Sequence, residues 1–315
     1  MAAPNPIQVY LAAVYTNQYI EGGDRYPQFN EHEKQLEKRF RNHNILESWH
    51  YVGKQKYVDY MRANNAKIFL DSGAFSSYTL GVKLKVEDYV NYIKWNQDII
   101  RVEDGNLMAS VLDGIGDPQE TFENQMQMER LGVRPLPCFH AGEDERYLEW
   151  YIQRYDYITL GGMVGASTKQ LEIWLDRMWN DYLTDGSGNP RIKVHGFGIT
   201  SIPLMERYPW YSCDSSSWIQ ATSFGAIVHP EFGPINISDK SPSLHDLNQH
   251  LFNLPEPERL RIEETLKADG FDPQRLSEVY QSRAAYNLLA YMKIQDNINA
   301  KNIVHKANIA RSLFT

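Results

Sequence analysis

Short apolar runs with strand character alternate with amphipathic helical stretches along most of the 315-residue chain. The expected strands are Gln8–Val14, Lys67–Leu70, Leu107–Leu112, Val133–Phe139, Tyr157–Leu160, Arg191–Val194 and Trp210–Cys213, with an eighth near Gly225–Val228 or in Pro234–Ile237. Strands that alternate with helices pair in parallel through right-handed crossovers. Seven or eight such units favour a (β/α)8 TIM barrel, with a doubly wound open sheet as the alternative.

The stretches between these runs have apolar residues along one helical face. The expected helices include Glu47–Arg62, Val86–Arg101, Pro118–Leu131, Glu143–Tyr155 and Pro203–Tyr208. Pro118 would stand at the first helical position, which proline favours. The proline-rich and charged segment Leu254–Asp272 predicts a boundary between a barrel domain, residues 1–253, and a packed C-terminal helical extension, residues 254–315, with helices in Pro273–Ser312.

Composition and hydropathy limit the class of protein. A hydrophobic content of 42% supports one large core. The mean hydropathy is −0.52, and no apolar run is long enough to cross a bilayer. Met1 to Pro6 lacks the basic start of a signal peptide, so we expect a cytoplasmic protein without membrane contact. Cys138 and Cys213 lie in apolar runs and are expected to be buried thiols.

The formal net charge of −8 argues against a broadly basic surface that wraps long nucleic acid. A local basic groove is still compatible with it. Candidates are Lys54 with Lys56, Lys83 with Lys85, and a set near the C-terminus whose alternative role is a solvated helix face: Arg283, Lys293, Lys301, Lys306 and Arg311. If the substrate is a nucleic acid, the shortage of positive charge also favours a helper protein that supplies the binding surface.

Polar residues or glycines directly follow six of the apolar runs. They are Asp71, Asp113, His140, Gly161-Gly162, His195-Gly196 and Asp214. One aspartate after a strand is often only the N-cap of the next helix. In a barrel, however, all six positions converge on the mouth that holds the active sites of barrel enzymes, so the set predicts a site there.

The paired aspartates suit glycosidic chemistry. One carboxylate attacks the anomeric carbon while the other manages protons at the leaving group. Asp113 could accept two parallel hydrogen bonds from an amidine-like edge, which guanine offers through N1–H and its 2-amino group. Backbone N–H groups at Gly161-Gly162 would reach O6, and Phe75 and His195 would stack on the base.

Metal binding is the competing use of the same residue types. It would need His140, His195 and Asp214 to face one another. No HxH, HExxH or paired-cysteine spacing supports such a site, so no metal is expected. The glycines of the run from His195 to Gly198 do not form a dinucleotide-binding fingerprint.

Four motifs resemble those of the tRNA-guanine transglycosylases and occur in that family's order. Phe69–Phe75 (FLDSGAF) resembles the DSGGF-type motif, and Leu160–Gly165 (LGGMVG) resembles the GGLAVG loop. Val194–Gly198 (VHGFG) resembles the LMGVG strand end. Cys213-Asp214 falls where the family has its nucleophilic aspartate.

The resemblance implies a role for each matching residue. Asp214 would form a covalent bond to C1′, and Asp71 would be the general acid and base. His140 stands where the family usually has glutamine. The implied substrate-binding residues are Ser72, Phe75, Asp113, His140, Gly161, Gly162, Met163, His195 and Gly196.

The chain also departs from the tRNA enzymes. It has no cysteine after Cys213, so their C-terminal zinc site is missing, and Ala74 replaces a motif glycine. These features are more similar to the zinc-less 7-deazaguanine DNA transglycosylases of phages and bacteria. The resemblance therefore implies that the protein replaces guanine in DNA with a base such as preQ0 and needs no cofactor. It also implies that the protein acts as a homodimer or with a helper DNA-binding protein. The alternatives are the same exchange on tRNA, a non-catalytic partner subunit, and a glycosidase that releases the base to water.

Overall fold

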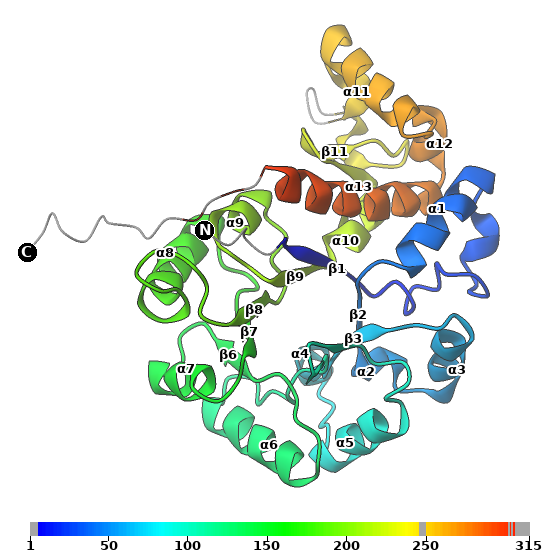
Figure 1. Cartoon of the computed structure of the whole chain (residues 1–315). Helices are drawn as coiled ribbons and strands as arrows, with labels where there is room; N and C mark the ends of the chain where they lie inside the picture. The colour runs from blue at the N-terminus through cyan, green and yellow to red at the C-terminus, as the bar shows by residue number, and fades with distance from the viewer. Residues whose placement is uncertain (1–5, 246–249, 302, 304, 306–315) are drawn as a thin grey trace, which may run out of the picture. The chain divides into compact units, whose positions relative to one another are not determined.

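Seven parallel strands form the central sheet of the computed structural model, which describes residues 6–245, 250–301, 303 and 305. The sheet curls, and its order is β3-β2-β1-β9-β8-β7-β6 (Figure 1). The strands are β1 (Gln8–Ala12), β2 (Ile45–Ser48), β3 (Ile68–Asp71), β6 (Cys138–His140), β7 (Tyr157–Gly161), β8 (Lys193–Gly196) and β9 (Ser212–Ser215). Pairing of β9 with β1 joins the last strand of the sheet to the first, with Asp214 opposite Tyr10.

The edges of this sheet, β3 and β6, are linked by an irregular segment, residues 108–111. The N–H of Ser110 donates to the carbonyl of Leu70 (2.9 Å), and the N–H of Val111 donates to the carbonyl of Leu136 (3.0 Å). These contacts are isolated bridges and not a regular strand. Pro135 and Pro137 have no N–H to give to a ladder, which explains why β6 begins only at Cys138. The structure therefore shows a curled, open sheet of seven strands and not the closed barrel that was predicted.

Three predicted elements were wrong, and the first is the strand Leu107–Leu112, which beyond Leu107 makes only the isolated bridges just described. The segment that contains Glu47 was expected to be helical, but Ile45–Ser48 is strand β2, between β1 and β3. The candidates for an eighth strand instead pair with each other as an antiparallel hairpin, β10 (Ala226–His229) and β11 (Gly233–Asn236). A second antiparallel pair, β4 (Val102–Glu103) and β5 (Asn106–Leu107), is a two-residue ladder.

Helices α3, α5, α6, α7 and α8 lie outside the curled sheet (Figure 1). The helices of this part of the chain are α2 (Trp49–Val52), α3 (Gln55–Ala63), α4 (Ala74–Thr79), α5 (Val86–Trp95), α6 (Pro118–Arg130), α7 (Glu145–Ile152), α8 (Thr168–Met178) with a π-helical turn at Trp179–Leu183, and α9 (Ile202–Arg207). Pro118 opens α6 as predicted, and the side chain of Asp117 caps it. Helix α5 is shorter than predicted because the chain turns at Ile99 and Ile100 to reach Ile68.

The chain divides into two compact units, and the sheet belongs to the first. This unit takes the described residues of Met1–Thr16, Asn44–Ser215 and Ile298–Thr315. A buried cluster at its centre contains Tyr10, Ala12, Leu46, Phe69, Met108, Leu136 and Tyr157. Met108 and Leu136 pack in the same core as strand residues, although they lie outside the regular strands.

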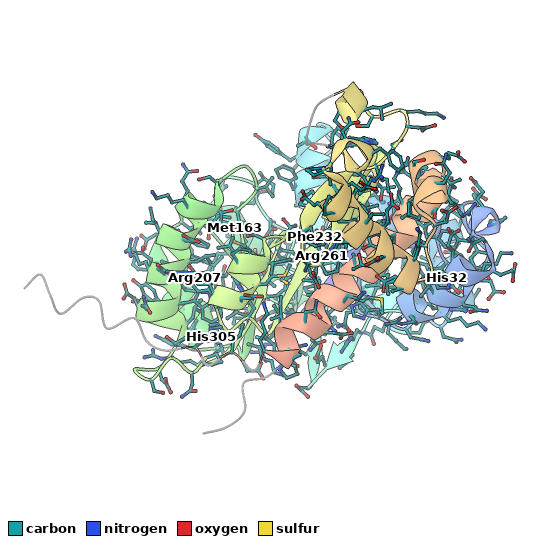
Figure 2. All side chains as sticks on the ribbon, turned by 90° about the horizontal axis from the view of Figure 1, so that it is seen from above. His32, Met163, Arg207, Phe232, Arg261 and His305 are labelled. Carbon is teal, nitrogen blue, oxygen red and sulfur yellow. The ribbon has the colours of Figure 1, made fainter. Side chains whose placement is uncertain are left out.

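The second unit takes Asn17–His43 and Ser216–Asn297. Its elements are α1 (Glu31–Arg41), α10 (Ser217–Ser223), the hairpin β10–β11, α11 (Glu256–Ala268), α12 (Pro273–Glu278), α13 (Tyr280–Ala300) and short 3-10 turns at Tyr26–Gln28, Pro242–His245 and Leu251–Asn253. Arg275 makes two hydrogen bonds to the buried Glu33 (2.9 and 2.8 Å). Arg261 lies over the ring of Phe232, 5.0 Å from its centroid (Figure 2).

The C-terminal half of this unit contains the helices expected after Pro273, in α12 and α13. The proline-rich segment before them is itself helical, in α11. The predicted helix beyond residue 305 lies outside the described residues, and the boundary expected between residues 253 and 254 stays a prediction. Within the part of the chain that the structure describes, no helix has the length and apolar character that a bilayer crossing requires.

Candidate active site

Three carboxylates lie at the C-terminal edge of the sheet. Asp71 ends β3, Asp113 follows the irregular segment, and Asp214 lies in β9. Burial raises the pKa of Asp71 from its ordinary value of 3.8 to about 7, and the negative charges of Asp113 and Asp214 add to the rise. The structure therefore brings the two predicted catalytic aspartates and the predicted base-reading aspartate close enough together for their charges to interact.

Asp214 is buried and held in one orientation. The N–H of Gly198 donates to its Oδ1 atom at 2.8 Å. Gly198 has a φ of +67°, a left-handed conformation that glycine adopts at little cost. The Nε2 atom of His195 lies 3.4 Å from the same oxygen. The Gly198 contact is a hydrogen bond, whereas His195 Nε2 has no hydrogen-bond partner among the described residues.

His195 is fully buried beneath Asp214. Its Nδ1 atom is 2.6 Å from the Ser212 hydroxyl, which is 2.7 Å from the Tyr157 hydroxyl. The rings of Phe69 and Phe197 pack edge-on against the imidazole, with centroids at 4.8 and 4.7 Å. In this conformation His195 is 0% exposed and offers no open face to a base, and the predicted stacking role stays a prediction.

His140 lies at the centre of a second polar cluster. Its Nδ1 atom is 2.7 Å from Glu143 Oε1, and its Nε2 atom is 3.5 Å from Asp113 Oδ2 and 3.4 Å from Cys138 Sγ. Burial opposes protonation of His140, but Cys138, Asp113 and Glu143 outweigh it and raise its pKa well above the ordinary value. Burial, with the charge of Asp113, raises the pKa of the Cys138 thiol to about 11, which is unsuited to a nucleophilic thiolate.

The glycines near this cluster make room for close packing. A Cβ atom on Gly161 would lie 2.8 Å from His140 Cδ2, and one on Gly162 would lie 2.9 Å from the Ala141 nitrogen. A Cβ atom on Gly196 would lie 2.9 Å from the ring of the buried Trp210, so this glycine serves packing against the tryptophan.

The remaining predicted contacts differ in exposure. Phe75, on α4, is 56% exposed, and its ring is available for stacking. Ser72 is buried, and its N–H donates to the Ser110 hydroxyl at 2.9 Å. Met163 is also buried.

A cavity of about 640 Å³ opens beside Asp113. Lys83 and Lys85 line it together with Tyr78 of α4, so one of the three predicted basic sites borders the candidate active site. At the C-terminus, Lys293 pairs with Asp269 and Lys301 pairs with Glu206. Arg283 is buried and donates to backbone carbonyls, and Lys306 and Arg311 lie outside the described residues.

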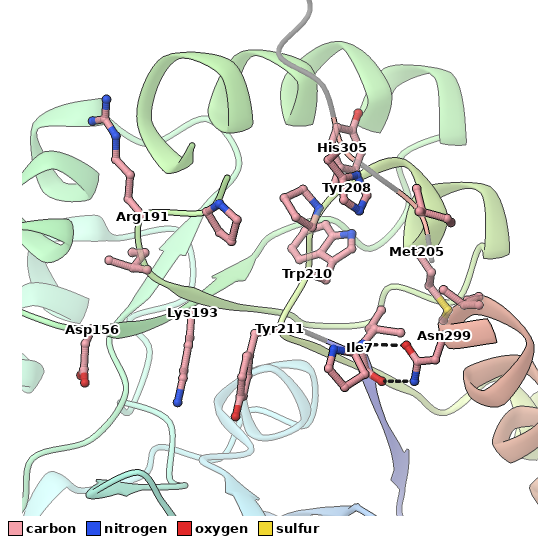
Figure 3. Close-up of a pocket in the computed structure, with 16 residues that line it drawn as sticks. Ile7, Asp156, Arg191, Lys193, Met205, Tyr208, Trp210, Tyr211, Asn299 and His305 are labelled. Carbon is pink, nitrogen blue, oxygen red and sulfur yellow. Dashed lines mark hydrogen bonds between the residues drawn. The ribbon is translucent and has the colours of Figure 1, made fainter. Parts of the chain in front are cut away.

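A second cavity of about 560 Å³ lies at the other end of the strands (Figure 3). Its lining includes Asp156 and Tyr211, which directly precede β7 and β9, and Arg191, which lies shortly before β8. Ile7 and Asn299 border it and exchange two hydrogen bonds of 2.9 and 3.0 Å. Barrel enzymes place catalysis at the opposite end, so we assign this cavity no part in the site.

His140 was predicted as a site residue, but Cys138 beside it and the buried carboxylate of Glu47 were not. Cys138 and His140 form a Cys-x-His pair, and alternate residues of a strand point to the same face, which is a readable signal. Glu47 is buried at the end of β2 and accepts hydrogen bonds from the Tyr15 N–H (2.5 Å) and the Thr16 hydroxyl (2.6 Å). Burial, partly offset by these bonds, raises the pKa of Glu47 to about 7.

Comparison with known proteins assigns the chain to no family: no protein-family model matches it, and no curated protein matches its sequence.

Proposed function

We propose that this chain is a base-exchange transglycosylase that replaces guanine in DNA with a 7-deazaguanine base, and that Asp214 is its nucleophile. The observation that carries the proposal is the gathering of Asp71, Asp113 and Asp214 at the C-terminal edge of the curled sheet. The order of the four sequence motifs, which resembles that of the tRNA-guanine transglycosylases, indicates the type of reaction. We also propose that residues 108–111 close the sheet as a (β/α)8 barrel, because they hydrogen-bond to both of its edges.

In the first step, Asp214 Oδ2 attacks C1′ from the face opposite guanine. The C1′–N9 bond breaks as the C1′–O bond forms, and guanine takes the proton from neutral Asp71. A pKa near 7 supports this role, because Asp71 is then partly protonated at neutral pH. The hydrogen bond from the Gly198 N–H orients the carboxylate of the nucleophile before attack.

In the second step, the incoming base restores the starting state of the enzyme. Asp71, now ionised, removes the ring N–H proton of the 7-deazaguanine. The freed nitrogen attacks C1′ and breaks the bond to Asp214. Two inversions give net retention, the proton returns to Asp71, and no redox cofactor or nucleotide triphosphate is consumed.

The base would be recognised by Asp113. Its Oδ1 atom is buried and has no hydrogen-bond partner among the described residues, although a buried acceptor normally has one. The N1–H and 2-amino group of guanine would supply two donors to this carboxylate. Phe75 offers an exposed ring on α4, and the cavity lined by Asp113, Lys83 and Lys85 would take the adjoining phosphates.

Incubation of the protein with labelled preQ0 and either guanine-containing DNA or tRNA tests this function. We expect label in DNA, none with Asp214→Asn, and wild-type incorporation with Asp88→Asn, which alters an exposed carboxylate on α5. Label in tRNA alone would transfer the proposal to tRNA exchange. Release of guanine without incorporation would instead identify a glycosidase, and no reaction on either polymer would favour a non-catalytic subunit.

A further inference from the structure

Strand β6 presents Cys138 and His140 on one face, two residues apart, and Asp113 lies beside them. One ligand atom from each residue lies within 4.8 Å of the other two. The Nε2 atom of His140 is 3.4 Å from Cys138 Sγ and 3.5 Å from Asp113 Oδ2. Tetrahedral zinc with bonds of about 2.0–2.3 Å separates its ligand atoms by roughly 3.3–3.8 Å, so these two separations match a zinc site.

The surroundings of His140 orient it as a metal ligand. Glu143 holds the ring from behind, because Oε1 is 2.7 Å from Nδ1 while Oε2 accepts the His140 backbone N–H at 3.0 Å. A carboxylate on Nδ1 favours the tautomer whose Nε2 lone pair is free, as in carboxylate–histidine–zinc arrangements. Nε2 faces Asp113 and Cys138, so a metal ion bound between the three residues would take the place of the Nε2 proton of the charged ring.

Strand β7, which pairs with β6, has a glycine next to these ligands, and the missing side chain leaves space between them. Gly161 lies opposite His140 in the register of β6 and β7. A Cβ atom at this position would lie 3.1 Å from Cys138 Sγ and 3.2 Å from His140 Nε2, so any larger residue would crowd the ligand atoms.

We propose that Asp113, Cys138 and His140 bind a divalent transition-metal ion, with Zn²⁺ as the cation that their donor atoms suit best. Thiolate and imidazole select zinc and its neighbours, whereas Mg²⁺ and Ca²⁺ prefer sites made only of oxygen. Binding breaks the S–H bond of Cys138 and the Nε2–H bond of the charged His140 ring, both protons leave to solvent, and the freed sulfur and nitrogen electron pairs bind the metal. Three protein ligands leave the fourth position open, as in catalytic and not structural zinc sites.

This inference goes beyond base exchange, which needs no metal. It has a consequence for that reaction, because a metal on Oδ2 of Asp113 prevents the two parallel hydrogen bonds that guanine would make. Zn²⁺ and guanine therefore compete for Asp113, and each lowers the apparent affinity of the other.

Cobalt substitution tests the site without any nucleic acid. The purified full chain is stripped with a chelator and titrated with Co²⁺, and its absorption spectrum is recorded. We expect one equivalent of Co²⁺ to give a thiolate-to-metal band in the near ultraviolet and intense tetrahedral visible bands, both lost when Zn²⁺ is added. Cys138→Ser should lose the near-ultraviolet band, whereas Cys213→Ser should keep it, because Cys213 is equally buried but outside the cluster.

Glu143→Gln provides a milder variant in case Cys138→Ser does not fold. It keeps all three ligands, so the spectrum should persist with an affinity about 10–100-fold weaker. Absence of cobalt bands in folded wild-type protein, or bands that Cys138→Ser retains, would overturn the metal site and assign the cluster to a protonated His140. The cobalt experiment and base incorporation are separate readouts, so either proposal can fail while the other stands.

Discussion

Replacing Asp71 with asparagine should stabilise the protein more at alkaline than at acidic pH. Burial and two neighbouring carboxylates raise the pKa of Asp71 from 3.8 to about 7, so the folded state holds this proton more tightly than the unfolded state. The ionisation penalty is absent below the unfolded pKa, grows between the two pKa values, and is complete above the folded pKa. Asparagine does not ionise and can still accept the hydrogen bond from the Gly73 N–H, which is 2.9 Å long in the wild type.

The size of this effect follows from the two pKa values of Asp71. At 1.36 kcal/mol per pKa unit, the full penalty has an upper limit of roughly 4 kcal/mol. Between pH 5 and pH 8 it changes by roughly 2–3 kcal/mol, and Asp71→Asn should gain that much relative to wild type.

Urea unfolding at pH 5 and pH 8, in the presence of a chelator, measures the free energies of unfolding that this prediction compares. The exposed replacement Asp88→Asn is the matched control and should show no comparable change with pH. A difference between Asp71→Asn and wild type that is the same at both pH values would refute the reasoning, whatever its sign.

Two further replacements test the packing beneath the site. Gly196→Ala would place a Cβ atom 2.9 Å from the ring of Trp210, so urea unfolding should show a loss of about 1–3 kcal/mol, whereas Gly186→Ala has nothing within 4 Å and should cost far less. Equal losses for the two alanines would contradict the close packing at Gly196. Ser212→Ala removes the hydroxyl 2.6 Å from His195 Nδ1 and should lower the free energy of unfolding by about 1–3 kcal/mol; an unchanged value would show that this buried bond contributes nothing.

The polar strand ends were predictable because they depend on local order along the chain. An apolar run followed by aspartate or histidine predicts where a strand stops, and Asp71 and His140 are the last residues of β3 and β6. Helix α6 was predictable for a similar reason, since Pro118 and the cap at Asp117 are local signals.

Strand β2 was not predictable in this way. Glu47 is charged and stands next to a helical pattern, so the sequence predicts a helix that begins at Glu47. Its burial is compensated by N–H groups of Tyr15 and Thr16, which are more than thirty residues earlier in the sequence. The second unit was unpredictable for the same reason, because its ion pair between Glu33 and Arg275 joins positions 242 residues apart.

The orientation of His195 also depended on tertiary structure. A flat ring at a strand end fits a base-stacking role, and the sequence contains no sign that the ring is enclosed. Phe69, Phe197 and Ser212 enclose it, and these residues come from three different segments of the chain. The position of His195 at the site was therefore predictable from the sequence, but its contact with Asp214 was not.

Trapping of the covalent intermediate tests the central claim most directly. A labelled, guanine-containing DNA oligonucleotide is incubated with the protein without an incoming base, denatured, and separated on a denaturing gel. We predict a labelled protein adduct with wild type, its disappearance when preQ0 is added, and no adduct with Asp214→Asn. An adduct that survives in Asp214→Asn, or base incorporation by that variant, would contradict the assignment of Asp214 as the nucleophile.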